Sequence, residues 1–449
     1  MSDGRAATTP TFADVNRDIA RTLGTPGNLY FTWMCVVGLI LAGGILAWTW
    51  QIWIGMGAAG KRTPTMWAMY ITSFVFWIGI GHAGTLISAI LYLFRARWRT
   101  SIFRAAEAMT IFAVLTAGLF PLIHAGRMWF AYFLLPYPNQ RDLWPNFRSP
   151  LVWDVFAIST YLSISTIFFI VGLVPDVAAL RDISTGWRRR VYAMLALGWE
   201  GSHSQWRHYR RAYGLFAALA TPLVLSVHSV VSWDFAMALV PGWHSTLFAP
   251  FFVNGAIFSG FAMVLVLVLP MRHFFGLHAY IQDKHLDAMG KLILVTSLVL
   301  TYFYVCEVFT AWYSGDHFER ASLFWKVTKA YAWALWLMYF CNCISPLILF
   351  WKKARTSPII LYVVSILVLI GMWFERFNII VPSLAHDFYP YTWGIYVPSP
   401  TDTMIVIGSF AFFFLLFLGF IRLMPSVSIV EVKETIPPPV KDSGHARHH

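Results

Sequence analysis

The chain alternates long apolar stretches with short polar segments over most of its length. A helix needs about 20 mainly apolar residues to cross a bilayer, whereas a barrel strand needs about ten. Ten stretches have the length of helical spans, so the pattern predicts an all-α integral membrane protein. We expect the spans at residues 29–54, 66–94, 105–135, 151–173, 213–240, 247–271, 289–314, 328–351, 358–381 and 402–423.

Composition and charge agree with a membrane location. Hydrophobic residues make up 58% of the chain and charged residues only 12%, which argues against an ordinary soluble fold. The net charge of +12 could suggest nucleic acid, but its distribution indicates orientation. With the N-terminus inside, the inner segments hold 24 of the 33 Lys and Arg residues and the outer loops hold 7. Because inner loops carry the excess of Lys and Arg, both termini are predicted to be cytoplasmic.

The two terminal segments and the cysteines add little chemistry. Residues 1–28 are predicted to be a cytoplasmic segment with a short interfacial helix at 11–24, or a solvated leader, and no cleaved signal. Residues 424–449 are predicted to be a disordered cytoplasmic tail. The four cysteines form no CxxC or CxxCH motif, so we expect no iron-sulfur cluster, covalent haem or metal site in this chain.

One hairpin carries three ionisable side chains into the expected hydrocarbon. His124 and Arg127 follow Pro121 in the third span, and Asp154 opens the fourth. Each such charge costs roughly 2.5 to 3.5 kcal/mol on insertion scales, so the group indicates a functional site. The sequence places His124 and Arg127 on one helix face and Tyr161 seven residues after Asp154. An ion pair between Arg127 and Asp154 that only holds the hairpin together is the alternative.

Other acids and bases inside the spans fall mostly in the same outer half, which scattered structural pairs would have no reason to do. His82 can be a buried core residue, a proton relay or a haem ligand. The candidates for a proton pathway are His82, His228, Asp234, Glu307, Glu375 and Arg376.

Three functions compete for these residues. A quinol-oxidising subunit needs two proton acceptors near one face; His124 and Asp154 suit these roles, with Arg127 tuning the carboxylate. Electrons would then leave through partner subunits. A di-haem cytochrome b needs paired histidines at equal depth, and only His82 with His228 qualifies. A transporter would place its site near the midplane with broken helices, whereas this cluster is displaced outward.

Several motifs resemble one known family. They are GHAGT in the second span, HAGRMWF in the third, Asp154 at the start of the fourth, HSVVSWDFAM in the fifth and WFERFN in the ninth. Together with the ten spans, they resemble the NrfD/polysulfide-reductase membrane subunits, most closely the quinol-binding NrfD-like subunit of bacterial alternative complex III. The resemblance covers residues 29–423.

The resemblance implies both a fold and a function. Spans 2–5 and 6–9 would form two four-helix bundles flanked by spans 1 and 10. Menaquinol or another quinol would bind in the first bundle near the periplasmic face, at His124 and Asp154. Electrons would pass to an iron-sulfur subunit and c-type cytochromes, beside a second NrfD-like subunit and a terminal oxidase, in the bacterial inner membrane. Proton translocation is also implied. A paralogue of this fold that does not bind quinol is the family's alternative.

Overall fold

The computed structural model describes residues 11–434 and 436, and within these residues the chain forms helices and loops without strands. In the described part of the chain, ten helical segments are long and apolar enough to cross a membrane, which confirms the predicted all-α membrane fold. They are α2 (Asn28–Ile54), α3 with α4 (Ala68–Leu93), α5 (Phe103–His124), α6 (Pro150–Ile183), α8 (His203–Ala236), α9 (Phe248–Phe274), α10 (Asp283–Tyr313), the segment beginning with α12 (Ala332–Phe350), α14 (Pro358–Ala385) and α15 (Pro400–Leu423).

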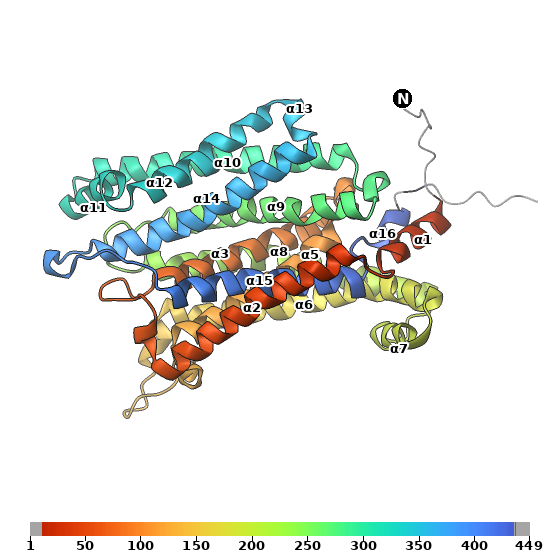
Figure 1. Cartoon of the computed structure of the whole chain (residues 1–449), viewed down its shortest axis with the longest axis horizontal. Helices are drawn as coiled ribbons and strands as arrows, with labels where there is room; N and C mark the ends of the chain where they lie inside the picture. Colours follow the sequence, from red (N-terminus) through yellow and green to blue (C-terminus); the bar gives the residue numbers. More distant parts are fainter. Residues whose placement is uncertain (1–10, 435, 437–449) are drawn as a thin grey trace, which may run out of the picture.

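The long helices lie side by side along the longest axis of the molecule (Figure 1). One end, called here the His124 end, carries the loops 55–67, 125–149, 237–247 and 386–399, with α11 (His317–Thr328). The opposite end, called the α1 end, carries α1 (Phe12–Thr22), α7 (Gly186–Leu195), α13 (Lys352–Arg355) and α16 (Ile429–Glu434). Thr11 caps α1 through a capping box with Asp14, so the helix expected near residues 11–24 is present.

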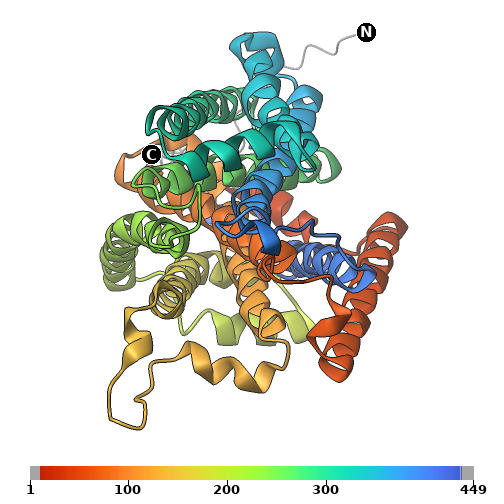
Figure 2. The ribbon, with the colours of Figure 1, turned by 90° about the vertical axis from the view of Figure 1, so that its left-hand side faces the viewer.

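Helix contacts divide the molecule into the two expected groups. α3, α5, α6 and α8 form the first bundle, and α9, α10, α12 and α14 form the second. The bundles meet where α9 packs against α3 and α8. α2 and α15 pack against each other and flank the bundles, as the view from the His124 end shows (Figure 2).

Glycines allow the close approach of α3 to its neighbours. A Cβ on Gly84 would lie 2.1 Å from the carbonyl oxygen of Ala106 on α5. A Cβ on Gly260 of α9 would lie 2.1 Å from the Cβ atom of Ala83 on α3. Small residues at such crossings let helices gain packing contacts that lipid cannot replace. The GHAGT motif therefore lies where α3 closely approaches both α5 of the first bundle and α9 of the second.

The α1 end contains a buried charged network that the sequence analysis did not predict, because the expected fourth span ended before Asp176. α6 runs to Ile183 rather than ending near residue 173, and it buries Asp176. Arg104 pairs with both Glu107 and Asp176, each at 2.8 Å. Arg99 pairs with Glu431 of α16 at 2.7 Å. Part of the segment expected to be a disordered tail is thus packed against the bundle, whereas residues 437–449 lie outside the described residues.

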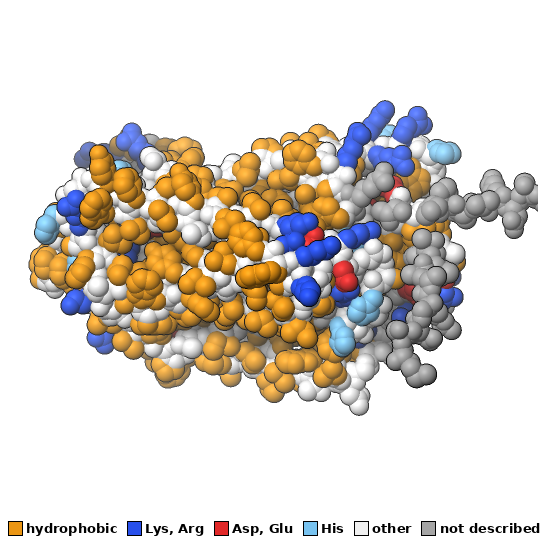
Figure 3. Space-filling view, turned by 90° about the horizontal axis from the view of Figure 1, so that it is seen from above, with side chains coloured by type: hydrophobic (Ala, Val, Ile, Leu, Met, Phe, Trp, Pro, Cys, Tyr) orange, Lys and Arg blue, Asp and Glu red, His pale blue; other side chains and the backbone are white. Residues whose placement is uncertain are grey.

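The surface is apolar along the helices. In the face shown in Figure 3, hydrophobic side chains cover most of the surface, and Lys and Arg lie at the left end and, in a larger group, in the right half, toward the α1 end. Large side chains such as Leu39 and Trp53 of α2 are about three-quarters exposed. An apolar surface on this scale is typical of a chain surrounded by lipid. The orientation across the membrane, with both termini inside, stays a prediction.

Candidate functional site

His124 is the last residue of α5, in the first bundle. Gly126 adopts a left-handed conformation (φ +76°), which ends the helix as glycine often does just beyond the last turn. Arg127 therefore lies outside the helix with an exposed side chain. The expectation that His124 and Arg127 share a helix face is wrong, and among the described residues no ion pair joins Arg127 to Asp154.

His124 instead contacts a lysine that the sequence did not suggest. The Nζ atom of Lys61, from the loop after α2, lies 2.9 Å from Nδ1 of His124. The same Nζ lies 4.0 Å from the ring centre of Tyr70 on α3. Burial lowers the pKa of Lys61 to about 7, and the nearby carboxylate of Asp402 opposes the shift. Asp402, at the start of α15, accepts hydrogen bonds from Gly60 N and the Tyr396 hydroxyl. His124 thus belongs to a polar cluster that joins both flanking helices to the first bundle.

Asp154 lies at the start of α6 beside a second carboxyl group, that of Asp234 near the end of α8. Asp154 is 4% exposed and Asp234 is 9% exposed, and the two side chains interact. Their neighbours Trp153 and Trp233 also meet, with ring centres 6.2 Å apart. Neither carboxylate oxygen of Asp154 has a hydrogen-bond partner among the described residues. Two adjacent buried carboxyl groups can hold and release a proton, and their free oxygens can bind a ligand.

Deeper in the first bundle, Tyr161 stacks on His82 with ring centres 5.0 Å apart. Its hydroxyl donates to the Gly81 carbonyl and contacts Thr85 Oγ1 at 2.7 Å. The His82 ring in turn contacts the His228 ring, with centres 4.5 Å apart. Nε2 of His82 and both ring nitrogens of His228 have no partner in the described chain. This arrangement does not suit a haem between the two histidines, because the rings touch directly and leave no space for the macrocycle.

The contacts among Tyr161, His82 and His228 lead toward Glu375 and Arg376 of the second bundle, and these five residues are called the polar row here. Phe252 of α9 separates the His228 ring from the guanidinium of Arg376, which lies 4.3 Å from the Phe252 ring centre. Arg376 pairs with Glu375 at 2.7 Å, although the two positions point in different directions on an ideal helix. Glu375 also accepts a hydrogen bond from the Tyr304 hydroxyl of α10. The contacts therefore lead from Tyr161 across the bundle interface to Tyr304.

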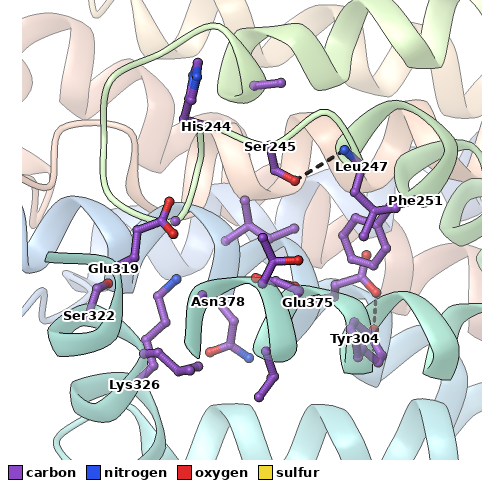
Figure 4. Close-up of a pocket in the computed structure, with 18 of the residues that line it drawn as sticks. His244, Ser245, Leu247, Phe251, Tyr304, Glu319, Ser322, Lys326, Glu375 and Asn378 are labelled. Atoms are coloured by element: carbon purple, nitrogen blue, oxygen red, sulfur yellow. Dashed lines mark hydrogen bonds between the residues drawn. The ribbon is translucent and has the colours of Figure 1, made fainter. Parts of the chain in front are cut away.

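A cavity of about 430 Å³ opens beside this row, in the half of the second bundle near the His124 end. Glu375 and Tyr304 lie at one side, and Glu319, Ser322 and Lys326 lie at another (Figure 4). Glu307 lines the cavity with no hydrogen-bond partner among the described residues. Apolar walls come from α8, α9, α10, α12 and α14, and include Trp233, the neighbour of Asp234.

Lys326 supplies a cationic side chain to the lining of this cavity. Its Nζ donates to Ser383 Oγ at 2.8 Å, and burial lowers its pKa while the charge of Glu307 opposes the shift. The volume is within the range of ligand pockets, and several polar groups face into it.

The sequence candidates thus fall into three groups. His124 lies with Lys61, Asp154 lies with Asp234, and His82, His228, Tyr161, Glu375 and Arg376 form the polar row, with Glu307 in the adjoining cavity. No hydrogen bond or ion pair links His124 to Asp154 within the described residues. Lys61, Asp402 and Lys326 are residues of these groups that sequence reasoning did not select. Lys61 lies shortly after the first expected span and Asp402 is the first residue of the tenth, and each position was a signal in the sequence.

Comparisons with known proteins agree on one family. The family described as polysulphide reductase, NrfD, matches residues 57–386. The chain is 25% identical to a putative dimethyl sulfoxide reductase membrane subunit of Halobacterium salinarum, over 91% of this chain and 94% of the relative. It is 23% identical to a selenate reductase subunit of Mesobacillus selenatarsenatis, over 79% and 82%. It is 20% identical to an Hdr-like menaquinol oxidoreductase integral membrane subunit of Archaeoglobus fulgidus, over 91% and 96%.

Proposed function

Because this chain belongs to the polysulphide reductase NrfD family, we propose that it is the quinol-binding membrane subunit of a respiratory quinol:acceptor oxidoreductase of the alternative complex III type. Menaquinol is the favoured substrate, since one relative is named as a subunit of a menaquinol oxidoreductase. The substrate would bind at the His124 end of the first bundle. The chain would act only within its complex, in the bacterial inner membrane.

The proposal rests mainly on the environment of Asp154. Its carboxylate is buried, has no hydrogen-bond partner among the described residues, and lies beside Asp234 at the same end as His124. A buried acceptor without a partner is costly unless a ligand or a proton satisfies it. Oxidation of a quinol requires acceptors for two protons, and a carboxylate pair with a nearby histidine supplies them.

The electrons would leave the chain for a partner. Iron-sulfur and c-type cytochrome subunits would receive them, and a second NrfD-like subunit and a terminal oxidase would complete the assembly. This expectation rests on the resemblance, and the relatives' names describe subunits of reductases and of an oxidoreductase.

We also propose that the polar row moves protons between the bundles. The rings of Tyr161, His82 and His228 lie in contact, and the Arg376–Glu375 pair lies on the other side of Phe252, beside the cavity. Histidine and carboxyl groups exchange protons through short contacts and through water. Proton release per quinol in proteoliposomes tests the role. Glu375→Gln should lower it toward the protons of the quinol alone, and an unchanged yield would contradict the pathway.

Two substitutions test the quinol site. His124→Ala and Asp154→Asn should each reduce quinol:acceptor activity by roughly 10²-fold or more, as expected for loss of a positioned acid or base. Asp142→Asn is the matched control, because Asp142 is an exposed carboxylate in the loop before α6. Copurification of the partner subunits shows whether each complex assembles. Normal turnover in both assembled variants would refute the site and favour a paralogue that does not bind quinol.

A further inference from the structure

The contact between Lys61 and His124 points to a step that the proposed function leaves open. If His124 takes a proton from the substrate, that proton must leave before the next turnover. Nδ1 of His124 lies 2.9 Å from Nζ of Lys61, and Nε2 has no hydrogen-bond partner among the described residues. One ring nitrogen can thus face a ligand while the other contacts the lysine.

We propose, on the basis of the proposed function, that Lys61 receives the proton that His124 takes from the quinol and releases it at the His124 end. The O–H bond of the quinol breaks as an N–H bond forms at Nε2 of His124. The Nδ1–H bond then breaks as an N–H bond forms at Nζ of Lys61. His124 ends neutral, Lys61 becomes an ammonium ion, and the quinol becomes an anion that keeps both electrons until the redox centre of a partner takes them.

The surroundings of Lys61 suit a group that gains and loses a proton. Lys61 is half-buried in a loop, so its proton can pass to water. The titratable groups that face it are His124 from α5, Tyr70 from α3 and the carboxylate of Asp402 from α15. The Tyr70 ring and Asp402 stabilise the ammonium form, since a ring face and a carboxylate both attract a cation.

The loss of hydration on burial disfavours the ammonium form of Lys61 and so opposes the effect of these contacts. Burial lowers the pKa of Lys61 to about 7, so a large fraction of the amine is neutral near neutral pH. A lysine with its ordinary pKa near 10.5 would already hold its proton and could not accept another. The neutral form predominates above pH 7, so the transfer should become faster as the pH rises through about 7.

The test is the pH profile of quinol oxidation in the assembled complex. The wild type should show a rise in rate near pH 7. Lys61→Met, which cannot titrate, and Lys61→Arg, which keeps its proton, should both be slower by at least about tenfold and should lose this rise. Arg62→Met is the matched control, because it removes the exposed neighbouring cation and should keep both rate and profile.

The outcomes are distinct. A normal rate in Lys61→Met, or a slow rate with the rise near pH 7 retained, would overturn the role of Lys61, because a structural lysine would not set the profile. His124→Ala decides the proposed function separately. Retained turnover in that variant would refute the quinol site whatever Lys61 does.

Discussion

The buried ion pair between Glu375 and Arg376 gives the sharpest stability prediction. Both side chains are 2% exposed or less. A guanidinium nitrogen of Arg376 lies 2.7 Å from a carboxylate oxygen of Glu375, on the side of α14 that packs against α9. Arg376→Met removes the cation and leaves Glu375 with the hydrogen bond from Tyr304. Removal of one partner of a buried pair costs about 3 to 5 kcal/mol. At 1.4 kcal/mol per tenfold change, this lowers the folding equilibrium constant by roughly a hundred- to a few-thousand-fold.

The double variant separates the pair from its surroundings. Glu375→Gln with Arg376→Met removes both charges, and neutral replacements of a buried pair are often tolerated. We therefore expect the double variant to be more stable than Arg376→Met alone, with a coupling energy of about 1 to 3 kcal/mol. Unfolding of the purified complex in a denaturing detergent measures all four proteins. If the stability lost in the double variant equals the sum of the two single losses, the charges do not stabilise each other, which would refute the predicted coupling.

Three further predictions concern packing, pH and haem. Gly84→Val should destabilise the chain by at least about 1 to 3 kcal/mol, because the valine side chain would meet the Ala106 backbone. Gly118→Ala should be neutral or stabilising, because a Cβ there points into open space on α5. Thermal unfolding of the two variants measures the difference. The pKa of Lys61 is lowered from 10.5 to about 7, so folding becomes more favourable as the pH rises between these values. Lys61→Met should therefore gain stability relative to the wild type at pH 7 more than at pH 9, and equal differences would contradict the burial. A reduced-minus-oxidised spectrum of the isolated chain should show no b-type haem, and a haem band would revive the cytochrome interpretation.

The sequence predicted the number and type of elements well. Apolar length alone is enough to identify ten spans, because a helix in lipid must satisfy its own backbone. The small residues of GHAGT also indicated close helix packing, which Gly84 provides against α5. These features depend on local composition and on the bilayer, so they can be inferred without knowledge of the tertiary contacts.

Helix ends and partners could not be inferred in the same way. α5 ends at His124 because Gly126 takes a left-handed conformation, and this removes Arg127 from the face it was expected to share. α6 extends beyond its apolar core because Arg104 neutralises Asp176 inside the protein. Whether a charged residue ends a span or is buried depends on a partner that is distant in sequence.

The candidate site shows the same limit. Sequence reasoning selected His124, Asp154 and Asp234, and all three lie toward the same end. Their actual partners differ from those expected: Lys61 contacts His124, and Asp234 lies beside Asp154. Residue type identified which side chains are unusual in a membrane, and only the packing of α6 against α8 and of the loop 55–67 against α5 brought the partners together.

The location of the quinol is the central claim, and photolabelling tests it most directly. A photoreactive menaquinone analogue would be bound to the assembled complex and the labelled peptides identified by mass spectrometry, with excess menaquinone as competitor. We expect label that excess menaquinone removes on the end of α5 and the start of α6, in peptides that contain His124 or Asp154. Label confined to the cavity of the second bundle, around Glu307 and Tyr304, would contradict it.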